Sequence, residues 1–356
     1  MAFINTNLRH VGTVGSGARC VLPGTTHGYV CGGYVGKTGA GHPWGPSVYG
    51  KMIEKFSLTS DGNAADVADM LAESRGQNGH SSTTHGYITG IGHDTPGSFL
   101  NRIERFQFSN DSDCVDWADL TETKRVSGTP CQSETHGFTM GGGDETGPTD
   151  VIDKFPFASQ TNATDWADCT AVQQGGGGAS SPTYGYSLAG GYGSSPSVYV
   201  NIIERFPFAS QTDSVDVADV TLARSGGAGI SSCEDGYCAG GLIIATNPAN
   251  GAPFWTLSVI DKHSFSSGAN STDHGDLPIE TGAGAMSAGG VSGTTHGYSV
   301  GGIYSWNASN HQYPREQIEK FAYVSNVTAT DVGDLVDADS LNIPHWGMDS
   351  CSGHQV

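Results

Sequence analysis

Four histidines recur in the same short context along the chain, and histidine is a common metal ligand. His27, His85, His136 and His296 each precede a glycine and an aromatic residue. A mononuclear zinc site needs several such rings within about 2.1 Å of one ion, whereas equivalent positions of a repeated unit are spread around a molecule. We therefore predict a structural role, in which each ring caps a turn or bonds to nearby backbone, and we assign no metal.

A second recurring block, Asp-x-Ala-Asp, offers carboxylates, which are ligands that calcium prefers. Aspartate also fixes turns by bonding to nearby backbone. We predict that these aspartates hold turns between strands and pair with the recurring histidine or with an arginine after the block; calcium binding is the alternative. Full copies begin at Asp66, Asp116, Asp165 and Asp216, looser copies begin at Asp273 and Asp331, and the arginines are Arg75, Arg125 and Arg224.

Aromatic side chains gather in segments whose lengths vary between repeats, while the rest of the repeat keeps its length. Variable loops on a rigid scaffold are where binding residues concentrate, and exposed rings favour sugar stacking or a protein interface. The alternative is that these rings pack over a sheet edge or fill a small core of their own loop. The candidate binding residues are Trp44, Tyr49, Phe254, Trp255, Tyr304, Trp306 and Tyr313.

Two common enzyme motifs are missing from the sequence. The glycine run from Gly175 to Gly178 is not followed by Lys-Ser or Lys-Thr, so it is not a phosphate-binding P-loop. No His-Glu-x-x-His metalloprotease motif occurs. We therefore predict that the protein is not an enzyme, has no catalytic residue and needs no cofactor.

These candidate residues belong to a repeat. The histidine block, the Asp-x-Ala-Asp block and a third block reading Ile-acid-base-Phe keep step through six units. The acids of the third block are separated by 50, 49, 51, 57 and 58 residues, and such self-similarity indicates a repeat architecture. The acids are Glu54, Glu104, Asp153, Glu204, Asp261 and Glu319.

The fourth unit shows the elements that position these residues. Residues 174–180 are small and glycine-rich, which predicts a first strand near a crowded axis, and residues 185–191 predict a strand that ends in two glycines. Residues 200–208 alternate, with Ile203 on one face and Glu204 and Phe206 on the other, and residues 215–220 alternate again. Four such strands form one propeller blade. We predict an all-β, six-bladed β-propeller of four-stranded blades.

The repeat resembles the kelch type of β-propeller over almost the whole chain, which we treat as one domain, residues 1–356. A diglycine closes the second strand of five units, and a phenylalanine lies in the next strand. Only Trp117 and Trp166 supply the tryptophan of the last strand, and Gly90-Ile91 replaces one diglycine. The diglycines are 32–33, 141–142, 190–191, 240–241 and 301–302, and the phenylalanines are Phe56, Phe106, Phe155, Phe206 and Phe321.

A second resemblance concerns the residues from Phe155 to Asp165, FPFASQTNATD, together with the Thr-His-Gly-Tyr block. They are similar to repeat proteins of marine bacteriophages, especially phages of cyanobacteria. This resemblance implies a virion component of a tail or appendage that contacts other virion proteins or host-surface glycans. The kelch resemblance leaves two alternatives. One is a secreted enzyme similar to galactose oxidase or active on glycans, although its copper ligands find no matching motif here. The other is a cellular scaffold that binds a protein partner.

Two segments compete for the first strand of the first unit. Residues 347–354 look like a seventh copy of a first strand, and residues 12–22 also offer one. We predict that the C-terminal segment, residues 343–356, closes the ring by joining blade one. The N-terminal residues 1–11 are then an arm, free or bound to another subunit of a homo-oligomer.

The chain has 16 basic and 36 acidic residues and a formal net charge of −20, which predicts no nucleic-acid partner because its surface repels phosphate. The sequence has no run of 18 apolar residues, so we predict no membrane insertion. The N-terminal residues do not resemble a classical signal peptide, so the expected virion or extracellular location comes from the phage resemblance. The eight cysteines form no CxxC pair, and we predict small buried strand residues.

Overall fold

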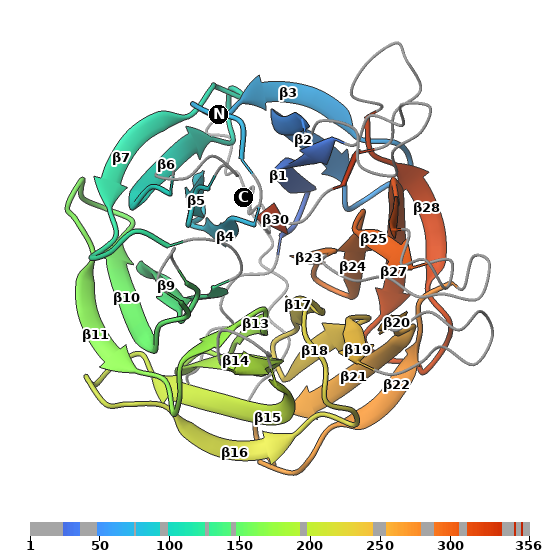
Figure 1. Cartoon of the computed structure of the whole chain (residues 1–356). Helices are drawn as coiled ribbons and strands as arrows, with labels where there is room; N and C mark the ends of the chain where they lie inside the picture. The colour runs from blue at the N-terminus through green and yellow to red at the C-terminus, as the bar shows by residue number, and fades with distance from the viewer. Residues whose placement is uncertain are drawn as a thin grey trace, which may run out of the picture.

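The computed structural model of the chain describes strands, turns and irregular backbone. The described strands form six antiparallel sheets of four or five strands around one axis, with two added two-stranded sheets, and Figure 1 shows the six as a ring of blades. This confirms the prediction of an all-β, six-bladed propeller. The described residues include no helix long and apolar enough to cross a membrane. They are residues 24–35, 48–74, 76–92, 99–124, 128–143, 147–192, 198–244, 254–278, 288–305, 312–336, 345–346 and 350–351.

Each blade runs from the axis to the rim in four antiparallel strands. Blade one has β30 (Ser350–Cys351), β1 (His27–Val35), β2 (Val48–Ser57) and β3 (Ala65–Asp69). Blade two has β4 (Asn78–Ser81), β5 (His85–Thr89), β6 (Arg102–Gln107) and β7 (Val115–Asp119). Blade three has β8 (Thr129–Gln132), β9 (His136–Met140), β10 (Val151–Pro156) and β11 (Thr164–Asp168).

The other three blades repeat this order and add short strands. Blade four has β13 (Gly177–Ser180), β14 (Tyr184–Tyr192), β15 (Val198–Pro207) and β16 (Val215–Asp219), and β12 (Gln173–Gln174) also pairs with β14. Blade five has β17 (Ala228–Ser231), β18 (Asp235–Ala239), β21 (Val259–Ser264) and β22 (Thr272–Asp276), with the hairpin β19 (Leu242–Ile244) and β20 (Phe254–Thr256). Blade six has β23 (Gly289–Ser292), β24 (His296–Val300), β27 (Gln317–Ala322) and β28 (Thr330–Asp334), with the hairpin β25 (Ile303–Ser305) and β26 (Gln312–Pro314).

The innermost strands meet closely at the axis. β13 contacts β8 and β17, and β17 contacts β23. A Cβ at Gly178 would lie 1.9 Å from the carbonyl oxygen of Pro130, and one at Gly290 would lie 2.0 Å from that of Gly229. Backbones approach this closely only where a side chain is missing. The crowded axis expected from the small residues of the first strands is therefore present.

β30 places the C-terminal segment in the ring. Tyr29 pairs with Cys351 and Val30 with Ser350, and β30 also contacts β23 of blade six and β4 of blade two. A further short strand, β29 (His345–Trp346), pairs with the end of β1. Blade one thus takes its innermost strand from the C-terminal segment. Residues 1–11 and 12–22, which the sequence assigns to an arm and to a competing strand, lie outside the described residues.

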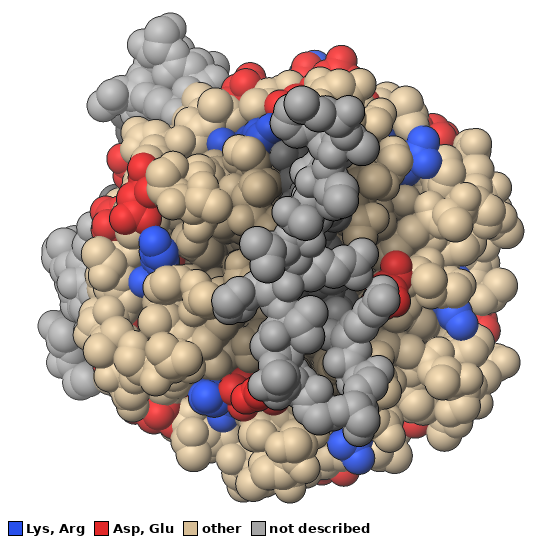
Figure 2. Space-filling model, turned by 180° about the vertical axis from the view of Figure 1, so that it is seen from behind, with Lys and Arg blue, Asp and Glu red and all other residues tan. Residues whose placement is uncertain are grey.

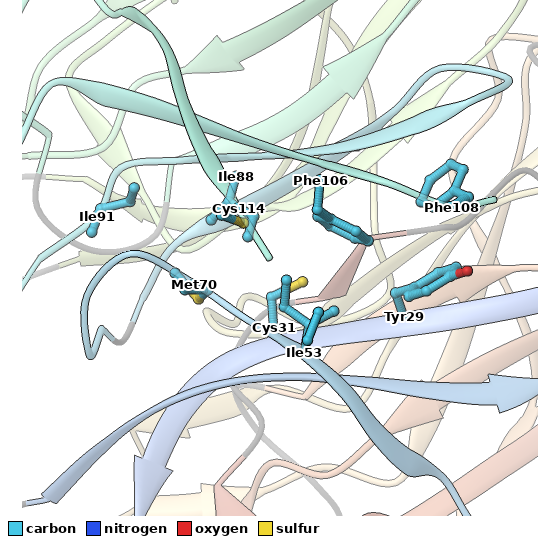
Figure 3. Packing of buried hydrophobic residues seen from close by; sticks show 10 residues of the cluster. Tyr29, Cys31, Ile53, Met70, Ile88, Ile91, Phe106, Phe108 and Cys114 are labelled. Atoms are coloured by element: carbon cyan, nitrogen blue, oxygen red, sulfur yellow. The ribbon is translucent and has the colours of Figure 1, made fainter. Parts of the chain in front are cut away.

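The hydrophobic core is divided among the junctions between blades. In Figure 3, Tyr29 and Ile53 of blade one lie against Ile88, Phe106 and Phe108 of blade two. The rings of Tyr29 and Phe108 stack with centroids 4.9 Å apart. Since burial of apolar surface is worth about 25 cal/mol per Å², each blade is stabilised by its neighbours. Stacked pairs recur at the next four junctions, at Tyr87–Phe157, Phe138–Phe208, Tyr186–Phe265 and Tyr237–Tyr323.

The alternation expected in the third strand holds, but both of its faces are covered. Phe206 packs against blade three, while Ile203 packs in the cluster around Tyr186. Glu204 pairs with Ser187 of β14 and is 1% exposed. A β-bulge between Ile203 and Glu204 shifts the register against β16, and the third strands of the other blades carry an equivalent bulge. The period-two pattern does not predict this bulge.

The described cysteines differ in state. Five are free and buried, and three of these lie in strands, as predicted. Cys233 lies in the turn between β17 and β18 and is disulfide-bonded, so the prediction of a small buried strand residue is wrong there. The free cysteines are Cys31, Cys114, Cys131, Cys169 and Cys238.

Candidate functional site

The disc has two faces with different connections. We call the face with the loops between the second and third strands of each blade the upper face. The lower face carries the turns between the third and fourth strands. Because neighbouring strands are antiparallel, successive connections lie at opposite ends of the strands.

The upper face is raised over four consecutive blades. β1 and β2 pair as far as Val35 and Val48, and β14 and β15 pair as far as Tyr192 and Val198. Blades five and six carry the hairpins β19–β20 and β25–β26, and β20 contacts β25. In the described parts of blades two and three no such added strand occurs. We call the added strands over blades four, five, six and one the raised sector, and the described upper ends of blades two and three the low sector.

The predicted loop aromatics belong to the raised sector wherever they are described. Trp255 lies in β20 opposite Ile243 and is half-buried. Tyr304 and Tyr313 are opposite each other in the β25–β26 register. Binding by these residues stays a prediction. Of the remaining candidates, Tyr49 and Phe254 lie in β2 and β20, and Trp44 and Trp306 lie outside the described residues.

A polar cavity of about 200 Å³ lies at the upper ends of blades two and three. Pockets for drug-sized ligands are larger, at roughly 300–1,000 Å³, and mostly apolar. The carboxylates of Glu122 and Asp150 instead make this cavity negative. The low sector therefore offers a small recess for polar contacts. The other lining residues are Thr123, Gly147, Pro148, Thr149 and Val172.

The four recurring histidines each begin the second strand of a different blade, at the lower face. The Nδ1 atoms of His85, His136 and His296 lie 2.7, 2.8 and 2.8 Å from the hydroxyl of the preceding threonine, and that of His27 lies 3.1 Å from Thr26 Oγ1. Burial lowers the pKa of His85, His136 and His296, and a neighbouring cation lowers it further. The rings bond locally and do not converge. Within the described residues, no group of three or more His, Cys, Asp or Glu is placed to hold a metal.

The Asp-x-Ala-Asp block forms the outermost strand of each blade, and its first aspartate is exposed in the four full copies. The second aspartate joins the blade to the next one through backbone. The carbonyl oxygen of Asp69 accepts a hydrogen bond from Cys114 N at 2.8 Å, and that of Asp334 accepts one from Ala64 N at 2.8 Å, which closes the ring. Equivalent bonds at the other junctions end on Asp119, Asp168, Asp219 and Asp276.

The acids of the Ile-acid-base-Phe block are the structural residues whose role the sequence reasoning missed. All six are at most 3% exposed, and five accept a hydrogen bond from a backbone N–H of the preceding blade. The sequence does contain a sign of this role, because an acid follows isoleucine at the same position of every unit. The pairs are Leu71–Glu104 at 2.9 Å, Thr121–Asp153 at 3.2 Å, Thr170–Glu204 at 3.1 Å, Thr221–Asp261 at 3.1 Å and Val336–Glu54 at 2.8 Å.

Cations join several of these buried acids. Lys124 Nζ lies 3.0 Å from Asp153 Oδ2, and both side chains are at most 1% exposed. Arg224 binds Asp261, so its predicted pairing with an aspartate of the Asp-x-Ala-Asp block is wrong; the other two arginines of that prediction, Arg75 and Arg125, lie outside the described residues. Glu319 of blade six lacks this backbone donor. The equivalent position in blade five is Pro278, which has no N–H. There Arg315 forms the ion pair with Glu319.

The run from Gly297 to Gly301 has the spacing of a Gly-x-Ser-x-Gly nucleophile elbow. That motif needs a sharp turn from a strand into a helix. Its serine, Ser299, lies inside β24 opposite Glu319 and is 1% exposed. The match is therefore part of the repeated second strand and has none of the exposure of a nucleophile.

The arrangement of the sheets defines the class of this protein as a six-bladed β-propeller. No protein-family model matches the sequence, and a search of curated proteins also finds no match. The kelch and phage resemblances therefore stay predictions.

Proposed function

We propose that this protein is a non-enzymatic recognition propeller that contacts its partner through the raised sector of the upper face. The observation that carries this proposal is the added hairpin length on four consecutive blades, above sheets that otherwise repeat. Ordering extra backbone costs conformational entropy, and binding residues concentrate in such loops. The half-buried ring of Trp255 supplies apolar surface there.

In the finer form of the proposal, the protein is a tail or appendage component of a phage particle and contacts virion proteins or host-surface glycans. Its net charge of −20 supports partners other than nucleic acid. The disulfide at Cys233 fits a virion or extracellular location, because disulfides persist in oxidising surroundings.

The packed axis also supports a non-enzymatic role. If the protein were an oxidase similar to galactose oxidase, side chains would have to converge at the disc centre and bind copper. In the described innermost strands, the backbones at Gly178, Gly229 and Gly290 instead pack directly against neighbouring strands. Elemental analysis of the purified protein separates the alternatives, since one copper per chain would favour the oxidase and contradict the proposal.

Binding can be tested with a glycan array and with partner proteins captured from particles. We expect Trp255→Ala to weaken the binding of the wild-type target roughly tenfold, while Trp255→Phe retains most of it because a ring remains. A control, Val324→Ser, changes a side chain on the lower face that is 95% exposed, and it should leave binding unchanged. Equal binding by all variants, or a wild-type protein that binds nothing, would contradict the proposal.

A further inference from the structure

Every blade places one basic side chain at the same position near the lower face, namely the base of the Ile-acid-base-Phe block. Lys and Arg side chains are spaced around the face seen in Figure 2. Basic residues are scarce in this chain, with 16 against 36 acids, so a ring of six is a concentrated feature. The six residues are Lys55, Arg105, Lys154, Arg205, Lys262 and Lys320.

Three of these cations are neutralised within the protein. Lys55 Nζ lies 3.0 Å from Asp111 Oδ2, and Lys320 Nζ lies 2.9 Å from Asp61 Oδ1. In both pairs the acid belongs to the lower-face turn of the next blade. Lys262 Nζ lies 2.9 Å from Asp235 Oδ2 of its own blade. These three cations lie on the consecutive blades five, six and one.

The other three cations lie on the consecutive blades two, three and four. Among the described residues, none of Arg105, Lys154 and Arg205 forms an ion pair. The reason is visible in the turn of the next blade. Asp111 lies three residues after the aromatic residue that directly follows the third strand, and the same position is Gln160, Gln211 or Gly268 in these turns.

The same three cations are held over aromatic rings. Arg105 Cζ lies 3.6 Å from the ring centroid of Trp117, Lys154 Nζ lies 3.4 Å from that of Trp166, and Arg205 Cζ lies 4.5 Å from that of Tyr184. A ring orders a cation without cancelling its charge. All three cations are half-buried, and burial lowers the pKa of Lys154. Each is thus a fixed, partly desolvated charge that an incoming anion would stabilise.

We propose that Arg105, Lys154 and Arg205 form a cationic arc that binds an anionic polysaccharide, one carboxylate or sulfate group to a blade. This inference rests on the proposed function and adds a second contact surface, on the face opposite the raised sector. The surrounding protein is strongly acidic, which disfavours duplex DNA with its charge every 1.7 Å or so. A polysaccharide with one charge per sugar or per disaccharide meets three separated cations with less repulsion.

Two triple variants form a matched test, since each removes three positive charges from equivalent positions. The arc variant is Arg105→Gln, Lys154→Gln and Arg205→Gln, and the control variant is Lys55→Gln, Lys262→Gln and Lys320→Gln. Calorimetry would measure binding of polygalacturonate, dextran sulfate and neutral dextran, in low salt and at about 0.15 M salt, where the Debye length is about 8 Å. We expect wild type to bind at least one of the two polyanions and not neutral dextran. The arc variant should lose at least roughly tenfold in affinity and the control less than about threefold.

A double variant keeps all three cations of the arc and gives two of them, Arg105 and Lys154, an acidic partner. Gln160→Glu with Gln211→Glu puts an acid where blade two offers Asp111 to Lys55, so we expect a loss similar to that of the arc variant. Both glutamines are exposed, so this variant keeps the test valid if the arc variant unfolds. The inference is overturned if wild type binds neither polyanion, if duplex DNA binds more tightly, or if both triple variants lose affinity equally. In each case the effect of Trp255→Ala on its own target still decides the proposed function separately.

Discussion

The buried acids link the smallest scale of this molecule to its largest, because each takes a hydrogen bond across a junction between blades. A buried charge is tolerable when it is paired and its lone pairs are satisfied. Asp153 is paired with Lys124 through Oδ2, and its Oδ1 accepts hydrogen bonds from Thr121 N and Thr121 Oγ1. Losing one partner would leave the other charge in a low-dielectric junction, so these pairs are where single substitutions should have large effects.

Lys124→Met should lower the free energy of unfolding by about 3 kcal/mol, because it leaves Asp153 buried without its cation. The matched control is Lys51→Met, which breaks an ion pair with Asp69 whose side chains are 50% and 41% exposed, and it should cost far less because solvent screens an exposed pair. Chemical denaturation of both variants measures the difference. Similar losses would show that the junction pair has no special weight.

His80 should make stability depend on pH. It is 1% exposed in β4, with Nδ1 3.2 Å from the Cys131 carbonyl oxygen and Nε2 3.2 Å from Thr89 Oγ1. Burial lowers its pKa to about 4. Because the folded pKa lies below the unfolded value of about 6.5, this contribution to stability is complete above pH 6.5 and is lost as the pH falls toward 4, by roughly 3 kcal/mol.

Denaturation of wild type and His80→Gln between pH 7 and pH 4 tests this dependence, since glutamine fills similar space without titrating. The variant should be less stable at pH 7 and should lose less stability on acidification. Parallel curves for the two proteins would place the acid sensitivity elsewhere.

At the scale of elements, much of the blade could be predicted from sequence because its signals are local. Period-two patterns placed Ile203 and Phe206 on the correct faces, and the spacing of the repeat set the number of blades. The partner of Arg224 was mispredicted, because the buried acid that binds it belongs to the third strand of the next unit. Asp111 pairs with Lys55, whereas the amide of Gln160 donates to the backbone carbonyl of Asp116. This contrast could not be predicted from sequence, because it depends on how the turn of one blade lies against the preceding blade.

Two glycines with the same backbone conformation separate steric crowding from backbone strain. Gly141 has φ +58° and Gly268 has φ +59°, so alanine costs about 1 kcal/mol at either for the left-handed backbone. A Cβ at Gly141 would also lie 2.5 Å from the carbonyl oxygen of Gln173, while one at Gly268 would meet nothing within 4 Å. We expect Gly141→Ala to cost roughly 1–3 kcal/mol more than Gly268→Ala in thermal melts. Equal costs would argue against crowding at the strand-ending diglycines.

At the scale of the whole molecule, several contacts between the first and last blades close the ring, and three of them lie far apart in sequence. β30 completes blade one, Val336 N donates to Glu54, and Ala64 N donates to the carbonyl oxygen of Asp334. These contacts join residues more than 250 positions apart, so they tie the chain into one cooperative unit. A closed ring also gives the upper-face hairpins a rigid base.

Deletion of residues 343–356 should therefore lower the melting temperature and make unfolding less cooperative, because blade one loses its innermost strand and the β4 and β23 strands lose a neighbour. Deletion of residues 1–11, which the sequence predicts to be an arm, is the control and should leave the melt unchanged. Calorimetry compares the two truncated proteins. A melt insensitive to the C-terminal deletion would contradict closure by β30.

The central claim is that a rigid propeller recognises its partner through the raised sector of the upper face. Hydrogen–deuterium exchange of the protein, alone and with the strongest ligand found on the glycan array or among particle proteins, tests it most directly. The account predicts protection in residues 242–256 and 303–314, with the inner strands unchanged. Protection confined to the low sector, or none in either hairpin, would contradict it.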